Sequence, residues 1–397
     1  MDTATRAARQ APPALPSILT LTLCAFALTT AEFVIAGLLP EVAAGLSVST
    51  SAAGHLVTAY ALGMAAGGPV LTLLTAGLPR KPLATALLAI FIAGNLAAAA
   101  APGYAVLLAG RAVSGSVVAT FFAMAVVTAA SLAPAGRQAS AVAKVALGFN
   151  LAMILGAPIG TALGQQFGWR ATFLAIAGLA AIALVLLVRL VPMHGAAAGS
   201  VAAELRVLRS RDLQLALALT ALGNAGVLMV FTYLAPLLTQ VAGFAAAAVP
   251  VLLLAYGLGA TLGNLAGGWL SDRALLPSLI GLLAALAAVL ALGIVAGGER
   301  IPAAALMVAT GALAFAVIPG MQTRVLATAG AAPTLGIALN ASGFQIAAAT
   351  AAWLGGRVID GPGLAALYPV GAVVTLLGAG LAYASWRRAR RAGCAKV

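Results

Sequence analysis

The feature that most constrains this chain is a series of apolar runs that recurs from one end of the sequence to the other. Each run is about 20 residues long, which is enough for an α-helix to cross a hydrocarbon core of ~30 Å. Only 7% of the 397 residues are charged and 63% are hydrophobic, whereas soluble domains carry ~25% charged residues. The sequence excludes a soluble globular fold and predicts an all-α membrane protein.

Breaks at proline, glycine and charged residues divide the chain into twelve predicted transmembrane helices. The predicted spans are residues 17–39, 52–76, 82–101, 104–132, 140–164, 171–191, 213–238, 249–270, 276–296, 303–323, 335–355 and 364–386. We expect an N-terminal tail (1–16), a six-helix half (17–191), a linker (192–212), a second six-helix half (213–386) and a basic tail (387–397). In the linker, apolar residues at helical spacing beside arginines predict a short helix on the membrane surface.

The basic residues are distributed unequally between the two sides of the predicted membrane. With the N-terminus inside, 17 of the 21 Lys and Arg residues fall on the inner side, three on the outer side, and Arg111 within a span. Cytoplasmic segments of membrane proteins carry this excess of positive charge. We therefore expect a multi-pass protein of a cytoplasmic or inner membrane with both termini in the cytoplasm. The net charge of +13 is thus explained by topology, and no nucleic-acid partner is expected.

An internal repeat relates the two predicted halves. A proline, a tyrosine and two glycines recur in the same order, each 196 residues later. The residues are Pro40, Tyr60, Gly63 and Gly67 in the first half and Pro236, Tyr256, Gly259 and Gly263 in the second. Spans one and two thus correspond to spans seven and eight in the same orientation. Parallel halves of this kind are typical of transporters that bind substrate between them, near the membrane midplane.

Two charged residues are predicted to lie well inside the membrane. Glu32 lies eight residues before Pro40, about 12 Å from the outer end of the first span, and Arg111 lies about 10 Å deep in the fourth span. A charge at this depth costs from ~2.5 to more than 10 kcal/mol unless it meets a partner or a wet cavity. We expect the two residues to neutralise each other. The pair could be purely structural, or it could couple to a proton or a substrate.

The loops after spans two and eight resemble the loop signature of the major facilitator superfamily. The first loop keeps only the basic end of that signature, Arg80-Lys81, and has Ala76 where the acid belongs. The second loop reads Gly268-Trp269-Leu270-Ser271-Asp272-Arg273 and keeps Gly268, Asp272 and Arg273. The resemblance implies that this loop holds helices of the two halves together in the outward-facing state, more weakly in the first half than in the second.

Two further motifs narrow the resemblance to one branch of the superfamily. The Arg-x-x-x-Gly pattern that begins at Arg111 looks like a motif whose arginine is associated with proton coupling. Gly156-Ala157-Pro158-Ile159-Gly160 resembles the antiporter motif of drug:proton efflux proteins, with Ala157 inserted and Thr161 in place of the last glycine. Gly156, Pro158 and Gly160 would give a bendable helix with a smooth face. The chain resembles a twelve-span drug:proton antiporter of the arabinose-efflux and chloramphenicol-efflux type.

This resemblance implies proton-coupled export of small, partly apolar molecules by alternating access, with Glu32 and Arg111 coupling the proton. Eight residues are candidates for contact with the substrate in a central cavity. They are Phe33, Phe149, Asn150, Asn224, Tyr233, Asn340, Phe344 and Gln345. The amides among them could instead form hydrogen bonds between helices. The motifs do not specify the substrate.

Other functions are compatible with parts of the pattern. A sugar or metabolite uptake carrier would share the fold, and a non-transporting receptor or scaffold is a second alternative. An enzyme is not expected, because the chain has two His and two Cys and no nucleophile–base pattern. No Cys/His cluster with metal-ligand spacing and no phosphate-binding glycine loop is present in the sequence. We expect a monomer in the lipid bilayer that uses the proton gradient and no cofactor.

Overall fold

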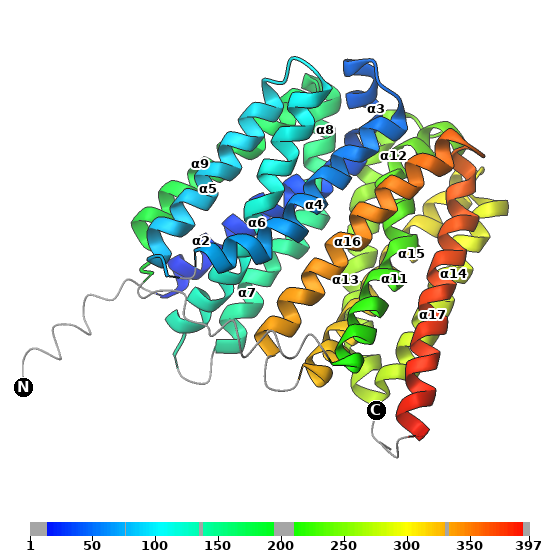
Figure 1. Cartoon of the computed structure of the whole chain (residues 1–397). Coiled ribbons are helices and arrows are strands. Elements are labelled where there is room, and N and C mark those ends of the chain that lie inside the picture. The colour runs from blue at the N-terminus through cyan, green and yellow to red at the C-terminus, as the bar shows by residue number, and fades with distance from the viewer. Residues whose placement is uncertain (1–13, 76, 135–137, 194–209, 330–332, 392–397) are drawn as a thin grey trace, which may run out of the picture.

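The computed structural model describes residues 14–75, 77–134, 138–193, 210–329 and 333–391, and almost all of them are helical (Figure 1). Ten of the described helices are long and apolar enough to cross a membrane by length and composition. Two further long helices, α4 (Thr50–Leu74) and α16 (Pro333–Asp360), complete a bundle of twelve membrane-crossing segments in two halves. The predicted all-α fold class is therefore confirmed.

The helices of the two halves follow the predicted spans closely. The first half consists of α2 (Ala14–Phe33), α3 (Ile35–Leu46), α4 (Thr50–Leu74), α5 (Arg80–Ala99), α6 (Tyr104–Leu132), α7 (Gln138–Leu151), the π-helical turn η1 (Ala152–Gly156), α8 (Ala157–Phe167) and α9 (Trp169–Leu190). The second half consists of α11 (Arg211–Thr232), α12 (Leu234–Pro236), the π-helical turn η3 (Leu237–Val241), a short 3₁₀ turn η4 (Ala246–Ala248), α13 (Val249–Arg273), α14 (Leu275–Ala296), α15 (Arg300–Thr328), α16 (Pro333–Asp360), a 3₁₀ turn η5 (Leu364–Ala366) and α17 (Leu367–Arg391).

Some expected segments differ from the structure or lie outside the described residues. Helix α17 continues to Arg391, so Arg387, Arg388 and Arg390 of the predicted basic tail lie on its final turns. Most of the predicted linker helix (192–212) lies outside the described residues, as do most of the N-terminal tail and residues 392–397. The boundaries proposed for these segments stay predictions.

Three of the membrane-crossing segments, the first, fifth and seventh, are interrupted along their length. Helix α2 ends at Phe33 and α3 begins at Ile35, so the first interruption directly follows Glu32 and Phe33. In the fifth segment, the turn η1 stands just before Pro158. Pro158 has no N–H, so the carbonyl of Ile154 loses its helical donor, and the chain winds more widely there. These interruptions explain why the structure has more helical elements than predicted spans.

The glycines of this fifth segment face the first one. A side chain at Gly156 would collide with Thr30, and one at Gly160 would press against Val34. The segment η1–α8 therefore packs closely along α2 and α3, which brings its backbone beside the interruption that follows Glu32.

The internal repeat is visible in the packing as well as in the sequence. Where α4 meets α6, three glycines sit directly against backbone carbonyls, and the same contacts recur where α13 meets α15. The pairs are Gly63–Ala112, Gly67–Ser116 and Gly115–Tyr60 in the first half, and Gly259–Val308, Gly263–Ala312 and Gly311–Tyr256 in the second. Every member lies 196 residues from its counterpart. Small residues let the backbones approach this closely, so both halves share one helix-packing scaffold.

Hydrogen bonds join the two halves on the side away from the start of α2 and the end of α17, which lie at the lower left and the bottom of Figure 1. The Ser51 hydroxyl in α4 donates a 2.9 Å hydrogen bond to the Asp360 carboxylate in α16. At a second contact between the halves, the Gln165 amide in α8 donates a 2.9 Å hydrogen bond to the carbonyl of Ala246 in η4. Nearer the centre, the Thr58 hydroxyl donates to the carbonyl of Ala349 at 3.3 Å. These three hydrogen bonds hold the two halves together at the end of the bundle opposite the start of α2 and the end of α17.

Candidate functional site

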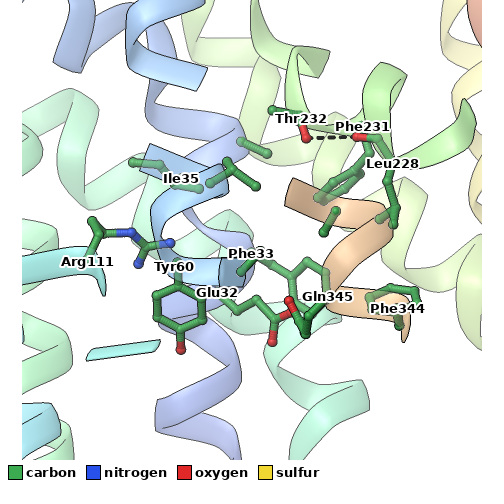
Figure 2. Close-up of a pocket in the computed structure, with 14 residues that line it drawn as sticks. Glu32, Phe33, Ile35, Tyr60, Arg111, Leu228, Phe231, Thr232, Phe344 and Gln345 are labelled. Carbon is green, nitrogen blue, oxygen red and sulfur yellow. Dashed lines mark hydrogen bonds between the residues drawn. The ribbon is translucent and has the colours of Figure 1, made fainter. Parts of the chain in front are cut away.

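A cavity lies between the halves at the level of Glu32 (Figure 2). It holds about 410 Å³ of empty space, part of which is open to solvent. Helices α2, α3, α4 and α6 of the first half and α11 and α16 of the second contribute its walls. The lining residues are Glu32, Phe33, Ile35, Ala36, Val57, Tyr60, Ala61, Arg111, Leu228, Phe231, Thr232, Phe344, Gln345 and Ala348.

Glu32 is held by a residue of the opposite half. Its Oε1 atom accepts a 2.8 Å hydrogen bond from Nε2 of Gln345 in α16. In Figure 2 the carboxylate points toward Gln345 and away from Arg111. Since α2 belongs to the first half and α16 to the second, this hydrogen bond connects the two halves through the one acid in the cavity wall.

Arg111 is bound to backbone. Its side chain is 1% exposed, and Nη1 donates a 2.6 Å hydrogen bond to the carbonyl of Ala31, the residue before Glu32. Nε donates a longer bond, 3.5 Å, to the carbonyl of Leu56 in α4. The guanidinium carbon lies 4.1 Å from the centre of the Tyr60 ring, a distance at which a cation is attracted to an aromatic face. Arg111 therefore fixes α6 to the backbones of α2 and α4.

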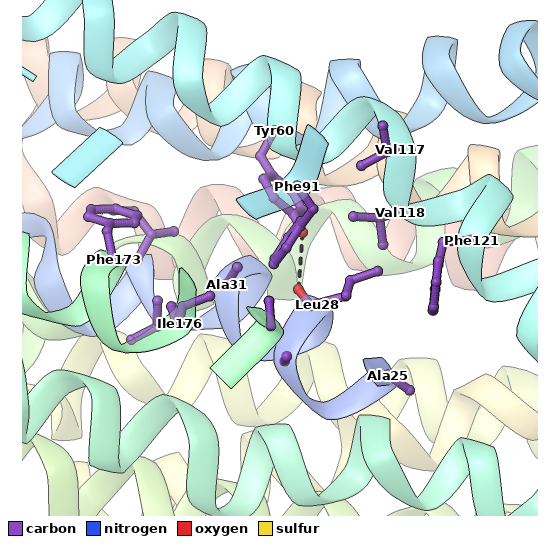
Figure 3. Close-up of a cluster of buried hydrophobic side chains, with 14 of the residues drawn as sticks. Ala25, Leu28, Ala31, Tyr60, Phe91, Val117, Val118, Phe121, Phe173 and Ile176 are labelled. Atoms are coloured by element: carbon purple, nitrogen blue, oxygen red, sulfur yellow. Dashed lines mark hydrogen bonds between the residues drawn. The ribbon is translucent and has the colours of Figure 1, made fainter. Parts of the chain in front are cut away.

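Behind this contact lies the apolar core of the first half (Figure 3). The Tyr60 hydroxyl donates a 3.1 Å hydrogen bond to the carbonyl of Leu28 inside a cluster that includes Phe91, Phe121 and Phe173. All of these side chains are buried. Because the ring of Tyr60 is fixed on both sides, the position of Arg111 is fixed as well.

The structure does not bring Glu32 and Arg111 into direct contact, so their mutual neutralisation stays a prediction. Both residues line one cavity, but within the described ranges they form no ion pair. The carboxylate binds Gln345 and the guanidinium binds backbone carbonyls. Depth along a helix follows from residue spacing, but it does not fix the direction in which a side chain points around that helix.

Two buried polar atoms in this group have no hydrogen-bond partner. They are Nη2 of Arg111, a donor, and Oε1 of Gln345, an acceptor. Gln345 is 4% exposed, so neither atom is compensated by open solvent. Unpartnered buried polar atoms are uncommon in folded proteins and call for an explanation.

An aromatic cavity adjoins the first. It holds about 290 Å³ of empty space and shares Phe33, Leu228, Phe231 and Phe344 with its neighbour. Aromatic rings meet around it: Phe33 and Phe231 have centroids 5.9 Å apart, and Phe231 and Tyr256 have centroids 5.0 Å apart. Thus Phe33 and Phe344, predicted from the sequence, do line the central space.

Other aromatic residues join this group. Phe149, also predicted, contacts Phe33 edge-on at 5.5 Å and Phe315 at 6.5 Å. Phe231, Tyr256 and Phe315 are not among the residues that the sequence predicts for the site. In the sequence Tyr256 is marked only by the repeat, in which it corresponds to Tyr60. That correspondence is the signal that could have indicated its position beside the cavity.

The predicted amides have different surroundings. Asn224 lines the aromatic cavity, where its Nδ2 atom donates to the carbonyl of Thr220 at 2.8 Å and contacts Sδ of Met321 at 3.1 Å. Asn340 accepts a 2.6 Å hydrogen bond from the Thr220 hydroxyl, which joins α16 to α11. Asn150 lies in α7, partly exposed, and lines neither of these cavities. Only Gln345 reaches Glu32.

Tyr233 also lies outside both cavities. It separates α11 from α12, is fully buried, and its hydroxyl donates a 2.7 Å hydrogen bond to the carbonyl of Ala352 in α16. A side chain at Gly54 of α4 would overlap the Tyr233 hydroxyl. Tyr233 therefore packs at the junction of the halves, nearer the closed end.

The residues of the predicted loop signature lie at the ends of helices. Arg80 and Lys81 begin α5, and Asp272 and Arg273 end α13. In this conformation the guanidinium of Arg273 lies 3.4 Å from the ring centre of Trp269, one turn earlier in the same helix. Gly268 faces open space. The role of this loop in the outward-facing state stays a prediction.

Two similar helical halves with a polar cavity between them define a multi-pass membrane transporter. The family model described as Major Facilitator Superfamily matches residues 21–334. The chain belongs to this superfamily.

Relatives agree with this assignment over nearly the whole chain. Inner membrane transport protein YdhP of Escherichia coli (strain K12) is 39% identical over 380 residues, covering 95% of this chain and 97% of the relative. Putative transporter AraJ of the same strain is 33% identical, with 86% and 87% covered. A chloramphenicol resistance protein of Streptomyces lividans is 34% identical, with 84% and 86% covered.

Solved structures share the fold. A bacterial homologue of the human lysosomal transporter Spinster, crystallised in an inward-facing and unoccupied conformation, matches with a TM-score of 0.73 and 18% identity over 94% of this chain and 96% of that chain. A D-xylose-proton symporter matches with a TM-score of 0.75 and 17% identity over 93% and 97%.

Proposed function

We propose that this protein is a proton-coupled exporter of small, partly apolar molecules, with Glu32 as the proton site. The observation that carries the proposal is the partly buried hydrogen bond between Glu32 and Gln345, which joins the two halves inside the central cavity. A buried ionisable group in a membrane protein is a functional site by default, because its burial is costly. The drug resistance named for one relative supports a drug-like substrate.

The same hydrogen bond suggests how proton binding could drive the movement of the halves. An ionised carboxylate accepts a stronger hydrogen bond than a neutral carboxyl group. Protonation of Glu32 would therefore weaken its bond to Gln345 and the attraction between α2 and α16. A substrate and a proton that compete at this position would bias the halves in opposite directions. The cycle needs the proton gradient and no bound cofactor or catalytic step.

We further propose that the chain works as a monomer with both termini in the cytoplasm. In that orientation the hydrogen-bonded end of the molecule, with Ser51–Asp360 and Gln165–Ala246, faces outward, and the structure corresponds to a state closed toward the outside.

Transport in proteoliposomes tests the proposal. With an imposed pH gradient, the wild type should move chloramphenicol against its concentration gradient, and Glu32→Gln should lose proton-driven transport by at least tenfold while eluting as an intact protein. Glu299→Gln is the matched control, since Glu299 precedes α15 and is exposed. Unchanged transport and proton flux in Glu32→Gln would remove Glu32 from the mechanism. Accumulation of a sugar in right-side-out cells would indicate uptake instead.

A further inference from the structure

The two unpartnered atoms of the central cavity have opposite hydrogen-bonding character. Arg111 Nη2 can only donate, whereas Gln345 Oε1 can only accept. Both side chains line the same cavity, one from each half of the protein. A bound molecule that offers an acceptor to the first and a donor to the second would satisfy both.

The other polar groups of the cavity are already engaged. The Glu32 carboxylate accepts from Gln345, the Tyr60 hydroxyl donates to Leu28, and the Thr232 hydroxyl donates to the carbonyl of Leu228. The rest of the wall is aliphatic or aromatic. Among the buried side-chain polar atoms of the wall, those without a hydrogen-bond partner are thus Nη2 of Arg111 and Oε1 of Gln345.

The charges of the wall favour a ligand without net charge. With Glu32 ionised, the lining holds one acid and one base, which sum to zero. Protonation of Glu32 leaves the guanidinium of Arg111 as the remaining charge, and it would repel a cation. A permanent cation would therefore bind poorly when Glu32 is protonated. When Glu32 is ionised, the cation would gain little affinity from it, because the carboxylate already accepts a hydrogen bond from Gln345.

The adjoining aromatic cavity provides apolar walls against which a ring would pack. Phe33 and Phe231 stand between the two cavities and line both. Their edge-on arrangement, 5.9 Å between centroids and 79° between planes, is a geometry that aromatic rings favour. A ring in the second cavity would place its polar substituent near Gln345 in the first.

We propose that the substrates are uncharged molecules that combine an aromatic or other apolar ring with a neighbouring hydrogen-bond donor and acceptor, such as a hydroxyl or amide group, and that Arg111 and Gln345 select them. This inference rests on the proposed function, because it assigns the substrate class of the same cavity. It goes further in excluding lipophilic cations as preferred substrates.

Binding to the purified full chain in lipid nanodiscs tests the inference. Equilibrium dialysis with radiolabelled chloramphenicol, an uncharged aromatic amide with hydroxyl groups, would be compared with competition by tetraphenylphosphonium, a cation with rings and no hydrogen-bonding group. We expect chloramphenicol to bind at least tenfold more tightly. Tighter binding of the cation, or no saturable binding of chloramphenicol, would overturn the inference.

A pair of amide variants tests the role of Gln345. Gln345→Leu should weaken chloramphenicol binding by about five- to tenfold, the factor expected for one lost hydrogen bond, and leave the affinity for tetraphenylphosphonium unreduced. Gln165→Leu is the matched control, because Gln165 also joins the halves through its amide but lies away from the cavity; its effect should be below twofold. Equal effects of the two variants would contradict the assignment.

These measurements separate the inference from the proposed function. Binding is measured without a proton gradient, so a protein that binds chloramphenicol but does not export it would support the inference and contradict export. A protein that exports cations in preference to uncharged amides would support export and contradict the inference. If Gln345→Leu does not fold, the relative affinity of the wild type for chloramphenicol and tetraphenylphosphonium still tests the inference.

Discussion

The two halves of this protein have the same helix contacts and different chemistry at their centres. In the first half, Tyr60 lies beneath the guanidinium of Arg111. In the second, the corresponding Tyr256 belongs to a buried cluster with Met307, which stands 196 residues after Arg111. Likewise Leu228 takes the place of Glu32. The comparison teaches that the charged site belongs to one copy of a scaffold that both copies share.

The glycine contacts explain how this difference is tolerated. Because backbone meets backbone where α4 crosses α6 and where α13 crosses α15, the spacing of these helices does not depend on the large side chains nearby. The first half can then have Arg111 where the second has Met307, with the same helix contacts in both. The chemistry of the site and the stability of the scaffold are therefore separable to a large degree.

The largest effect is expected when the charge is copied into the second half. Met307 is 4% exposed, so Met307→Arg would bury an uncompensated cation and lower the free energy of unfolding by about 3–5 kcal/mol. Met307→Leu, which keeps the volume, should cost less than about 1.5 kcal/mol. Unfolding in detergent micelles measures both. Normal stability of Met307→Arg would mean that α11 offers it a carbonyl, as Ala31 does for Arg111, and that the halves are more alike than described.

The shared glycine contacts should be equally sensitive in the two halves. Gly67→Val and Gly263→Val would each force a side chain into the backbone of the neighbouring helix, with an expected loss of about 1–3 kcal/mol. Gly281→Val is the control, since a Cβ at Gly281 in α14 would meet no heavy atom within 4 Å. A marked difference between Gly67→Val and Gly263→Val in the same unfolding measurement would show that the scaffold, too, has diverged.

The smallest loss of unfolding free energy is expected for a hydrogen bond between the two halves. The contact between α4 and α16 has the Ser51–Asp360 hydrogen bond, whereas at the corresponding contact between η1 and α13, Gly257 packs against the backbone of Met153 and Ile154. Ser51→Ala should therefore cost about 0.5–1.5 kcal/mol. Ser116→Ala, whose hydroxyl bonds to Val113 in its own helix, should cost less. If thermal unfolding gives the same loss of stability for Ser51→Ala and Ser116→Ala, the Ser51–Asp360 hydrogen bond does not hold the halves together.

Much of the fold could be predicted from the sequence because the membrane imposes a length on every apolar helix. The span predicted at 104–132 coincides with α6 (Tyr104–Leu132), and the repeat at Tyr60 and Tyr256 corresponds to a real contact in each half. Proline and glycine also indicated where the fifth segment bends, although not the π-helical form of that bend.

The site was predictable only in part. Residue spacing placed Glu32 and Arg111 at similar depth, and both line one cavity. Their actual partners, Gln345 and the carbonyl of Ala31, could not be derived, because they depend on the rotation of each helix and on the interruption after Phe33. Backbone acceptors leave no mark in a sequence, so the binding of Arg111 to Ala31 had no signal that could have revealed it.

The attachment of Arg111 to a backbone carbonyl has a consequence for ion leakage. A guanidinium keeps its charge at physiological pH, and a carbonyl, unlike a carboxylate, cannot cancel that charge. The wall of the central cavity therefore keeps a fixed positive charge, which protonation of Glu32 would leave unbalanced. A fixed arginine of this kind raises an electrostatic barrier to cations in a pore. A sodium ion that entered the cavity would meet that barrier beside Arg111.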